Sequence, residues 1–384
     1  FLINVLMNCH DPAVLQQCLD CIDQWISSCE LTNSLFLTPD FTNLIISFIL
    51  SLSSDHHTMY QLGYSIIKNI CNQSDICINA IIESEFIQKS IDFYQIIKST
   101  NPDDALQKEI LNMLYFVVKS GQVPPEILMN LIDIVSDYQF DPLSSNLYDI
   151  LLLASAYVES DENYCFFLIE RIPLDSFNVN FDTLSDLEQA AFFRLLISIF
   201  DYADKLSLAV IADQFRWDTI LAFDDRPENE IVKQYFAYFL CSAFTKCDQM
   251  IIGAFEANVF QLLFAWCENS TYSLCNASAK AMLRALTYLI EPIGLELLNA
   301  GILNIIIKQI DSNSKTLFKE ICRAISVLNN YAETNDKKDL CALLNDILFI
   351  NILRSAGEDE EISSDDMEIL KEAIQSIQDN QLWR

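Results

Sequence analysis

The sequence has few of the residues on which most enzyme and nucleic-acid sites depend. Its 384 residues include 6 glycines and 3 histidines. The glycines stand too far apart for a phosphate-binding loop such as G-x-G-x-x-G or a Walker loop. Lys and Arg are also scarce, 23 residues against 54 Asp and Glu, so the net charge is −31. Because phosphate contacts need clustered Lys and Arg, this charge argues against a nucleic-acid ligand.

Long apolar runs are missing as well. No run reaches the roughly 18 residues that a membrane-spanning helix needs. A net charge of −31 would also repel an anionic membrane surface, so we expect no membrane partner. The first apolar stretch, residues 1–7, lacks a basic flank and makes a poor signal peptide. Thirteen cysteines, an odd number without a tight framework, indicate reduced thiols. We therefore predict an intracellular protein, in the cytoplasm, the nucleus or both.

The sequence offers only weak candidates for catalytic or metal-ligating residues. Cys9, Cys18, Cys21 and Cys29 lie near His10, but two of these cysteines fall inside an expected helix. A structural zinc site usually takes two ligand pairs on turns, and a core cysteine behaves as a small apolar residue. No nucleophile-elbow pattern surrounds any serine, and no pair of carboxylates can be singled out by spacing. We predict no catalytic residues, no metal, no cofactor and no enzymatic activity.

The sequence does contain ample material for a core. Apolar residues make up 52% of the chain and aromatic residues 11%, which excludes a disordered acidic chain. In segment after segment the apolar residues recur at i, i+4 and i+7, the period of a helix. Strict alternation and the Asn-Gly or Asp-Gly turns of hairpins are nearly absent. These patterns predict an all-α protein.

Eight expected helices share one apolar triplet, and its spacing predicts a repeat. The central residues are separated by 39 to 47 residues, about 43 on average, which is the range of armadillo and HEAT repeats. A helical bundle would give similar triplets, but eight consecutive ones favour a solenoid. We predict a right-handed α-solenoid of about eight armadillo/HEAT-like repeats over residues 1–355. The triplets are Cys18/Ile22/Trp25, Gly63/Ile67/Ile70, Ile110/Leu114/Val117, Ile150/Ala154/Tyr157, Phe192/Leu196/Ile199, Phe236/Leu240/Ala243, Met282/Leu286/Leu289 and Ile321/Ile325/Leu328.

A second apolar helix is expected after each triplet. Examples are residues 43–52, 126–136, 206–223 and 295–310. Turn signals precede several triplet helices, at Asp11-Pro12, Asn101-Pro102, Asp141-Pro142 and Arg226-Pro227. Pro suits the first turn of a helix because its missing N–H would have no partner there.

The C-terminal part differs in character. Residues 356–366 hold the acidic block GEDEEISSDD, which we predict to be a solvated linker. Ser363 and Ser364 lie in an acidic context suited to phosphorylation. Residues 367–384 are predicted to form a C-terminal amphipathic helix and tail, which either caps the last repeat or docks on a partner.

One stretch carries a resemblance to a known family. The segment LLNAGILNIIIKQIDSNSKTLFKEICRAISVL (residues 297–328) resembles the junction between two armadillo repeats of importin-α, the nuclear import adaptors. Ala300-Gly301 before an apolar helix, Lys319-Glu320-x-Cys322 and Ile325-Ser326 look like that family's repeat core. The preceding LRALTYLI (residues 283–290) is similar too. This specific resemblance covers about 50 residues, and the remainder matches in period and helix pattern.

The resemblance implies where a partner would bind. Importin-α repeats place a Trp and, one turn later, an Asn on the helix that lines a concave groove. These side chains hold the lysine stems and the backbone of a peptide. No Trp occupies an equivalent position here and only Asn69 matches the Asn, whereas Arg284 and Tyr288 resemble the residues that replace this pair in the family's middle repeats. The expected concave-face residues are Asp20, Gln24, Ser65, Asn69, Asn112, Phe116, Arg194, Tyr238, Arg284, Tyr288 and Arg323.

Fold and charge together predict a non-enzymatic protein-binding scaffold. A net charge of −31 attracts basic proteins, although a charged outer face also occurs simply for solubility. We expect an extended, basic peptide on the concave face, with Phe116, Tyr238 and Tyr288 covering the stems of its side chains. The most specific version is a divergent importin-α-like nuclear import adaptor. The alternative is an assembly or chaperone-like scaffold that binds a folded protein.

Overall fold

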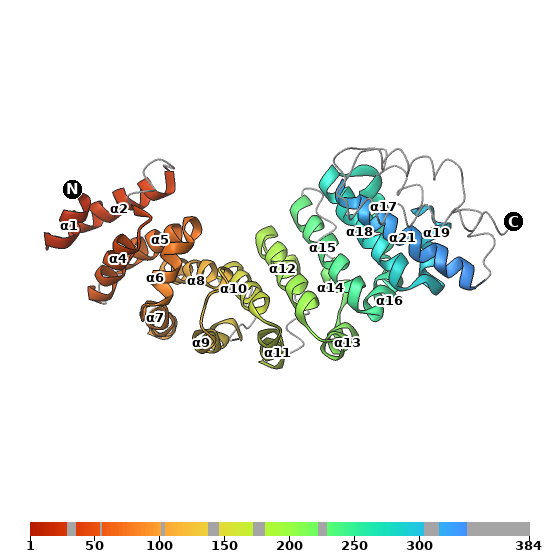
Figure 1. Cartoon of the computed structure of the whole chain (residues 1–384), viewed down its shortest axis with the longest axis horizontal. Coiled ribbons are helices and arrows are strands. Elements are labelled where there is room, and N and C mark those ends of the chain that lie inside the picture. The colour runs from red at the N-terminus through yellow and green to blue at the C-terminus, as the bar shows by residue number, and fades with distance from the viewer. Residues whose placement is uncertain are drawn as a thin grey trace. The chain divides into compact units, whose positions relative to one another are not determined.

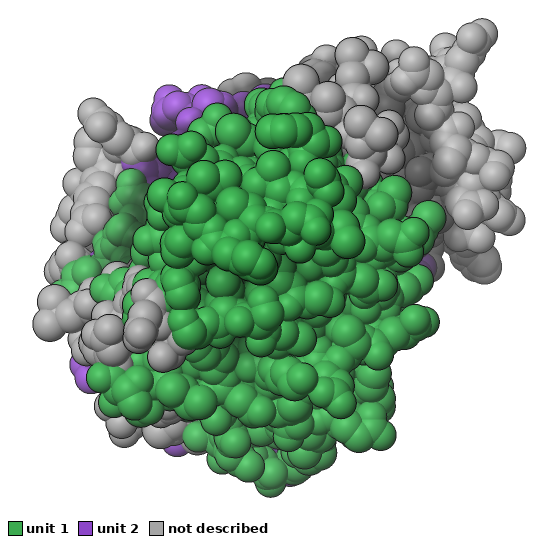
Figure 2. Space-filling model, turned by 90° about the vertical axis from the view of Figure 1, so that its left-hand side faces the viewer, with its two compact units in different colours: residues 1–179, 183–203 green, residues 180–182, 204–384 purple. Residues whose placement is uncertain are grey.

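The chain is built from helices, as predicted. The computed structural model describes residues 1–28, 36–53, 56–100, 104–136, 146–171, 181–221, 229–302 and 315–335. Every regular element in these ranges is a helix, and the fold class is an all-α solenoid. The chain divides into two compact units, unit 1 (residues 1–179 and 183–203) and unit 2 (residues 180–182 and 204–384), shown in two colours in Figure 2.

The described helices follow one another along the chain in two groups, one for each unit. Unit 1 contains α1 (Leu2–Asn8), α2 (Pro12–Ser28), α4 (Pro39–Ser51), α5 (His57–Gln73), α6 (Asp75–Ile82), α7 (Phe86–Thr100), α8 (Asp104–Lys119), α9 (Pro125–Ser136), α10 (Leu147–Ser160), α11 (Glu162–Arg171) and α12 (Asp186–Tyr202). Unit 2 contains α13 (Lys205–Gln214), α14 (Trp217–Ile220), α15 (Glu230–Lys246), α16 (Asp248–Glu256), α17 (Val259–Asn269), α18 (Tyr272–Tyr288), the π-helical turn η4 (Ile290–Gly294), α19 (Leu295–Asn299) and α21 (Lys315–Thr334). A 3-10 turn, η2 (Phe181–Thr183), precedes α12.

Within each unit the helices form two layers. The eight helices that carry the triplets make the first layer, in which each packs on the next: α2, α5, α8, α10 and α12 in unit 1, and α15, α18 and α21 in unit 2. Helices α4, α7, α9 and α11 of unit 1 and α16 and α17 of unit 2 pack on these helices and make the second layer. Figure 1 shows α7, α9 and α11 in a row beneath α8, α10 and α12 of unit 1. The repeat that the triplets predict is therefore confirmed.

The triplets form the core between the layers. Ile67, Leu114, Leu196, Leu240 and Leu286, the central residues of five triplets, are all fully buried. Stacking a helix on its neighbour removes this apolar stripe from water, which contributes roughly 25 cal/mol for each Å² of apolar surface. The core is thus a continuous strip within each unit, as expected of a helical-repeat protein.

Two members of the predicted triplets are not core residues. Trp25 is 49% exposed, and its ring lies tilted against that of Phe36, with ring centroids 6.2 Å apart. It lies about 200° around α2 from Asp23, the residue that faces α5, so no first-layer helix of unit 1 covers it. Leu289 follows the end of α18 and is half-buried.

Local signals set where several helices begin. Thr38 caps α4 by accepting a hydrogen bond from the Phe41 N–H, and Pro39 follows in the first turn. Ser185 and Glu188 form a capping box at α12. Helix α2 begins at Pro12, as its turn signal predicts. The signals at residues 101–102, 141–142 and 226–227 lie outside the described residues.

The predicted helix over residues 206–223 is wrong. In the described part, residues 206–221, the chain forms α13 and α14 instead, separated by Phe215 and Arg216, whose backbones are extended. The Phe215 ring is buried against Trp217 and Phe239, at centroid distances of 4.8 and 5.6 Å. We infer that anchoring this ring in the core outweighs one more turn of helix.

The predicted helix over residues 295–310 is also wrong in its described part. Helix α19 ends at Asn299, and Gly301 then adopts a φ of 97°. The Gly301 N–H donates to the Leu298 carbonyl at 3.0 Å, a helix-ending arrangement that favours glycine. Residues 303–314 lie outside the described residues.

Two further predictions concern membranes and the C-terminus. In the described part of the chain no single helix could cross a bilayer, and only the pair α16 and α17, bent by 81°, has the length and composition when both are counted together. The boundaries of the predicted acidic linker (356–366) and C-terminal helix (367–384) lie outside the described residues, so they stay predictions.

Replacing a central triplet residue should destabilise the fold far more than replacing an exposed leucine of the same helix. Leu196 is fully buried in α12, whereas Leu187 is 57% exposed. We expect Leu196→Ala to lower the free energy of unfolding by about 2–5 kcal/mol, because it leaves a cavity. Leu187→Ala should change it by no more than about 0.5 kcal/mol. Urea denaturation followed by circular dichroism measures both, and equal effects would contradict the assigned core.

Candidate functional site

The candidate site is the outer side of the first layer, turned away from the second layer. The predicted residues stand two positions before or after the central triplet residue, which places them about 200° from it around each helix. None of them is buried. Those that are exposed are Asp20, Gln24, Tyr238, Tyr288 and Arg323, and those that are half-buried are Ser65, Asn69, Asn112, Phe116, Arg194 and Arg284.

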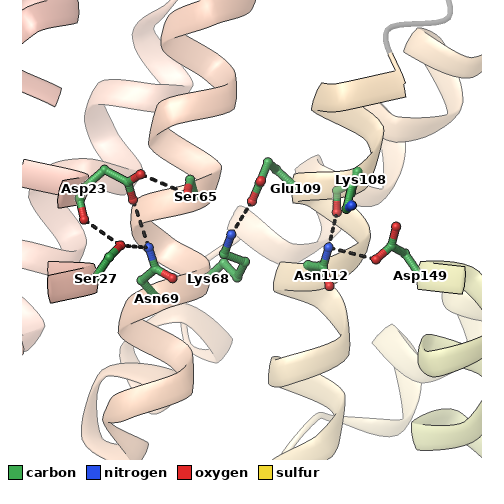
Figure 3. Close-up of polar contacts among 9 residues, drawn as sticks. All are labelled: Asp23, Ser27, Ser65, Lys68, Asn69, Lys108, Glu109, Asn112 and Asp149. Atoms are coloured by element: carbon green, nitrogen blue, oxygen red, sulfur yellow. Dashed lines mark hydrogen bonds and ion pairs between the residues drawn. The ribbon is translucent and has the colours of Figure 1, made fainter. Parts of the chain in front are cut away.

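A polar network joins α2 to α5 on this side. Asp23 accepts hydrogen bonds from the hydroxyl of Ser65 at 3.2 Å and from the side-chain amide of Asn69 at 2.9 Å. The Asn69 amide also donates to Ser27 at 3.0 Å (Figure 3). The Asn69 amide predicted to hold a peptide backbone thus already bonds the neighbouring helix. Burial raises the pKa of the Asp23 carboxyl, an effect that these hydrogen bonds and the Lys68 charge oppose.

An ion pair joins α5 to α8. The Lys68 ammonium lies 2.7 Å from a Glu109 carboxylate oxygen (Figure 3), and the two side chains are only 22% and 18% exposed. At this exposure water screens the pair less than it screens a surface pair. The pair therefore helps to fix how the two helices lie side by side.

A buried carboxyl joins α8 to α10. Asn112 donates from its side-chain amide to Asp149 and to the Lys108 carbonyl, each at 3.0 Å (Figure 3). Asp149 is only 2% exposed. Burial raises the pKa of its carboxyl, and the Lys108 charge and the Asn112 hydrogen bond oppose that rise. Sequence reasoning missed this residue, because its burial depends on how two helices distant in the chain pack.

Helices α10 and α12 approach each other closely. The hydroxyls of Ser155 and Ser198 lie 2.7 Å apart, and Ser198 donates to Glu159 at 2.8 Å. Ser198 and Ala156, which occupy positions equivalent to predicted site residues, are both buried. The outer side is therefore closed at this point, although the Arg194 guanidinium reaches the ring of Tyr115, 5.7 Å from its centroid.

In unit 2 the predicted residues lie on α15, α18 and α21. Arg284 of α18 forms an ion pair with Glu320 of α21, and the two side chains are 19% and 18% exposed. Tyr238 accepts a hydrogen bond from Gln234 at 2.9 Å. Tyr288 is 45% exposed, and Arg323 is exposed as well.

The arrangement offers hydrogen bonds, charges and aromatic rings along a surface. In the described ranges no three or more His, Cys, Asp or Glu side chains are grouped so that they could hold a metal. Two open hollows lie elsewhere, on the second layer of unit 1, one lined by Tyr94, Lys98 and Asp133 and the other by Met129 and Phe167. The first-layer surface is suited to contacts with another protein.

Comparisons with known proteins support the fold. No protein-family model matches the sequence, and no curated protein does. A structure of an engineered protein, target OR497 of the Northeast Structural Genomics Consortium, aligns with a TM-score of 0.74 at 14% identity, over 98% of this chain and 88% of that one. A second structure concerns a conserved phosphorylation switch in the interaction between cadherin and beta-catenin. It aligns with a TM-score of 0.66 at 11% identity, over 99% of this chain and 75% of that one.

These likenesses define an armadillo-like helical fold. The neighbour from the cadherin and beta-catenin structure is an armadillo protein. At 11% and 14% identity the comparisons show the fold alone. They show no particular likeness to importin-α.

The raised pKa of Asp149 gives a testable pH dependence. Because the carboxyl titrates at higher pH in the folded chain than in the unfolded chain, its contribution to stability is present in acid and is lost as the pH rises through the folded pKa. Asp149→Asn removes the buried charge and can still accept from Asn112. We expect this variant to gain stability over the wild type at neutral pH and to lose that gain in acid.

Urea denaturation of both proteins across this pH range measures the effect. Asp92→Asn is the matched control, because Asp92 is exposed on α7 of the second layer. A stability difference for Asp149→Asn that stays the same at every pH would contradict the assignment.

Proposed function

We propose that the protein is a non-enzymatic scaffold that binds an extended, basic segment of another protein on the outer side of α2 and α5. One observation carries the proposal. The first 67 residues contain no Lys or Arg, while carboxylates stand on the outer side of α2. The first Lys or Arg in the chain is Lys68, and its charge is already paired with Glu109. No earlier Lys or Arg would repel a basic segment from this surface.

The groups on α2 suit a cationic side chain. Asp20 is exposed and accepts a hydrogen bond from Gln24 at 3.0 Å, which holds its carboxylate in one orientation. Asp23, one turn further along, is held by Ser65 and Asn69. Each carboxylate oxygen has a second lone pair that can accept from a Lys or Arg of the partner. A nearby cation would also lower the raised pKa of Asp23 and so favour its ionised form.

Aromatic side chains supply the apolar part of such a contact. Phe116 is half-buried on the outer side of α8, and its ring centroid lies 5.2 Å from that of Tyr115. Rings of this kind cover the aliphatic stems of Lys and Arg and attract their charges. Because the helices that hold them are packed and cross-bonded, little ordering is needed when a partner binds.

The narrower version of the proposal is a divergent importin-α-like import adaptor in the cytoplasm, the nucleus or both. The resemblance of residues 297–328 supports it, and the missing Trp and Asn pattern departs from it. The described cysteines are free thiols, most of them buried in the core, which fits a reducing compartment.

Charge reversal of Asp20 tests the proposal. Fluorescence anisotropy would follow a labelled Lys- and Arg-rich nuclear-signal peptide and a scrambled peptide of equal charge, at low and moderate salt. We expect Asp20→Lys to weaken binding of the signal peptide about three- to tenfold, because an attraction becomes a repulsion at an exposed site.

Asp40→Lys is the matched control, since Asp40 is exposed in the first turn of α4, a second-layer helix. Equal losses in the two variants would mean that only the overall acidic field acts, and the proposed site would be rejected. Binding of the scrambled peptide as tight as that of the signal peptide would reject the import version.

A scaffold for a folded protein is the second candidate, and one observation favours it. Ile96, Met129 and Phe166 are each more than two-fifths exposed, on the successive second-layer helices α7, α9 and α11. A folded partner that docks on this side would lose affinity in Phe166→Asp and keep it in Asp20→Lys, the reverse of the pattern expected for the basic segment.

A further inference from the structure

Three cationic side chains stand on the outer side of α18 and α21 in unit 2, in contrast to the carboxylates on α2. Lys280 and Arg284 stand one turn apart on α18, and Arg323 stands on α21. Glu320 lies on the same side, but its carboxylate is paired with Arg284. Glu291, three residues after Tyr288, is hydrogen-bonded to Tyr331 of α21. The three cations still outnumber these two carboxylates, in a chain whose net charge is −31.

The ion pair between Arg284 and Glu320 brings these cations together. It joins α18 to α21, and Arg323 lies three residues after Glu320, one turn along the same helix. Lys280 lies one turn before Arg284 on the other helix. The pair thus holds two further cations on one surface, one on each side of it.

The charged groups of Arg323 and Lys280 have no bonding partner among the described residues. Arg323 is exposed and Lys280 is half-buried, and neither forms an ion pair, a hydrogen bond or a ring contact with any described residue. By contrast, among the described residues of unit 1, Lys68, Lys89 and Arg171 are each paired with a carboxylate.

Two tyrosines extend this surface. Tyr288 is 45% exposed at the end of α18, one turn after Arg284, and Tyr238 is 38% exposed on α15, which packs directly on α18. Each phenol can donate a hydrogen bond to an anionic oxygen. With Lys280, Arg284 and Arg323 they give a surface of mixed cationic and aromatic character.

We infer that this surface, defined by Tyr238, Lys280, Arg284, Tyr288 and Arg323, binds an acidic segment of a partner protein. Arg323 presents a planar fork of donors that matches a carboxylate or a phosphate, and Lys280 adds a point charge. The rest of the chain repels such a segment, so its binding would be directed here by charge. The inference is independent of the basic segment proposed for α2 and α5, which concerns other residues and the opposite charge.

Charge reversal at Arg323 tests the inference on the full chain. The probes are a labelled Glu- and Ser-containing peptide and the same peptide phosphorylated on its serines, followed by fluorescence anisotropy. Arg323→Glu should weaken binding of the peptide about tenfold. Lys280→Glu should act in the same direction.

Lys89→Glu is the matched control, because Lys89 is an exposed lysine on α7 of unit 1 and its replacement makes the same change in charge. Unchanged binding in Arg323→Glu, or an equal loss in Lys89→Glu, would overturn the inference. Because Arg323 is exposed, we expect its variant to fold normally, and melting curves of all variants check this. The basic peptide and Asp20→Lys report on the other site, so each proposal can fail without the other.

The acidic block of this chain at residues 357–366 is a competing occupant that the same assay distinguishes. A full chain with Glu358, Asp359, Glu360 and Glu361 changed to their amides retains the surface on α18 and α21. Equal binding of the probe to this variant and to the wild type supports a site open to a partner. Binding to the variant alone would mean that the chain covers its own site, and the partner inference would be withdrawn.

Discussion

The structure depends on the packing of one apolar stripe of each first-layer helix against the next helix and the second layer. Ile67, Leu114 and Leu196 show how complete this burial is within unit 1. A single helix cannot remove its stripe from water alone, so each helix is stable only with its neighbours. Everything on the outer side of the layer, including the candidate binding surfaces, is positioned by this packing.

Apolar packing is not directional, whereas the polar contacts between neighbouring helices depend on their geometry. The network of Asp23 with Ser65 and Asn69, the pair of Lys68 with Glu109 and the bond of Asn112 to Asp149 each join one first-layer helix to the next. Apolar packing tolerates small slips along the helix axis, whereas a hydrogen bond or ion pair loses its geometry after such a slip. The side-chain amides in these contacts already donate within the protein. Asn69 and Asn112 therefore differ from exposed amides that are free to bind another protein.

Much of the fold could be predicted from the sequence because helical periodicity is a local property. The eight triplets identify the eight first-layer helices, and most of their members are buried. The predictions failed where tertiary packing decides. The Phe215 ring divides one expected helix into two, and Trp25 packs on Phe36 but stays half-exposed instead of joining the core. For the candidate site, periodicity predicts which side chains leave the core, but the partners of those side chains stand 37 to 46 residues away in the chain. Asp149 and Asp23 could not have been found without those distant contacts.

The outward positions, two residues before and after each buried central triplet residue, affect how such a protein can evolve. A substitution at Asp20, Tyr238 or Arg323 alters surface chemistry without disturbing the core, because these side chains stand on the far side of their helices. The core itself asks only for apolar side chains of suitable size. Very different sequences can therefore specify the same backbone arrangement, as TM-scores of 0.66 and 0.74 at 11% and 14% identity illustrate. The same helices can accept a new partner through a few outward replacements, so binding preference can evolve separately from the fold.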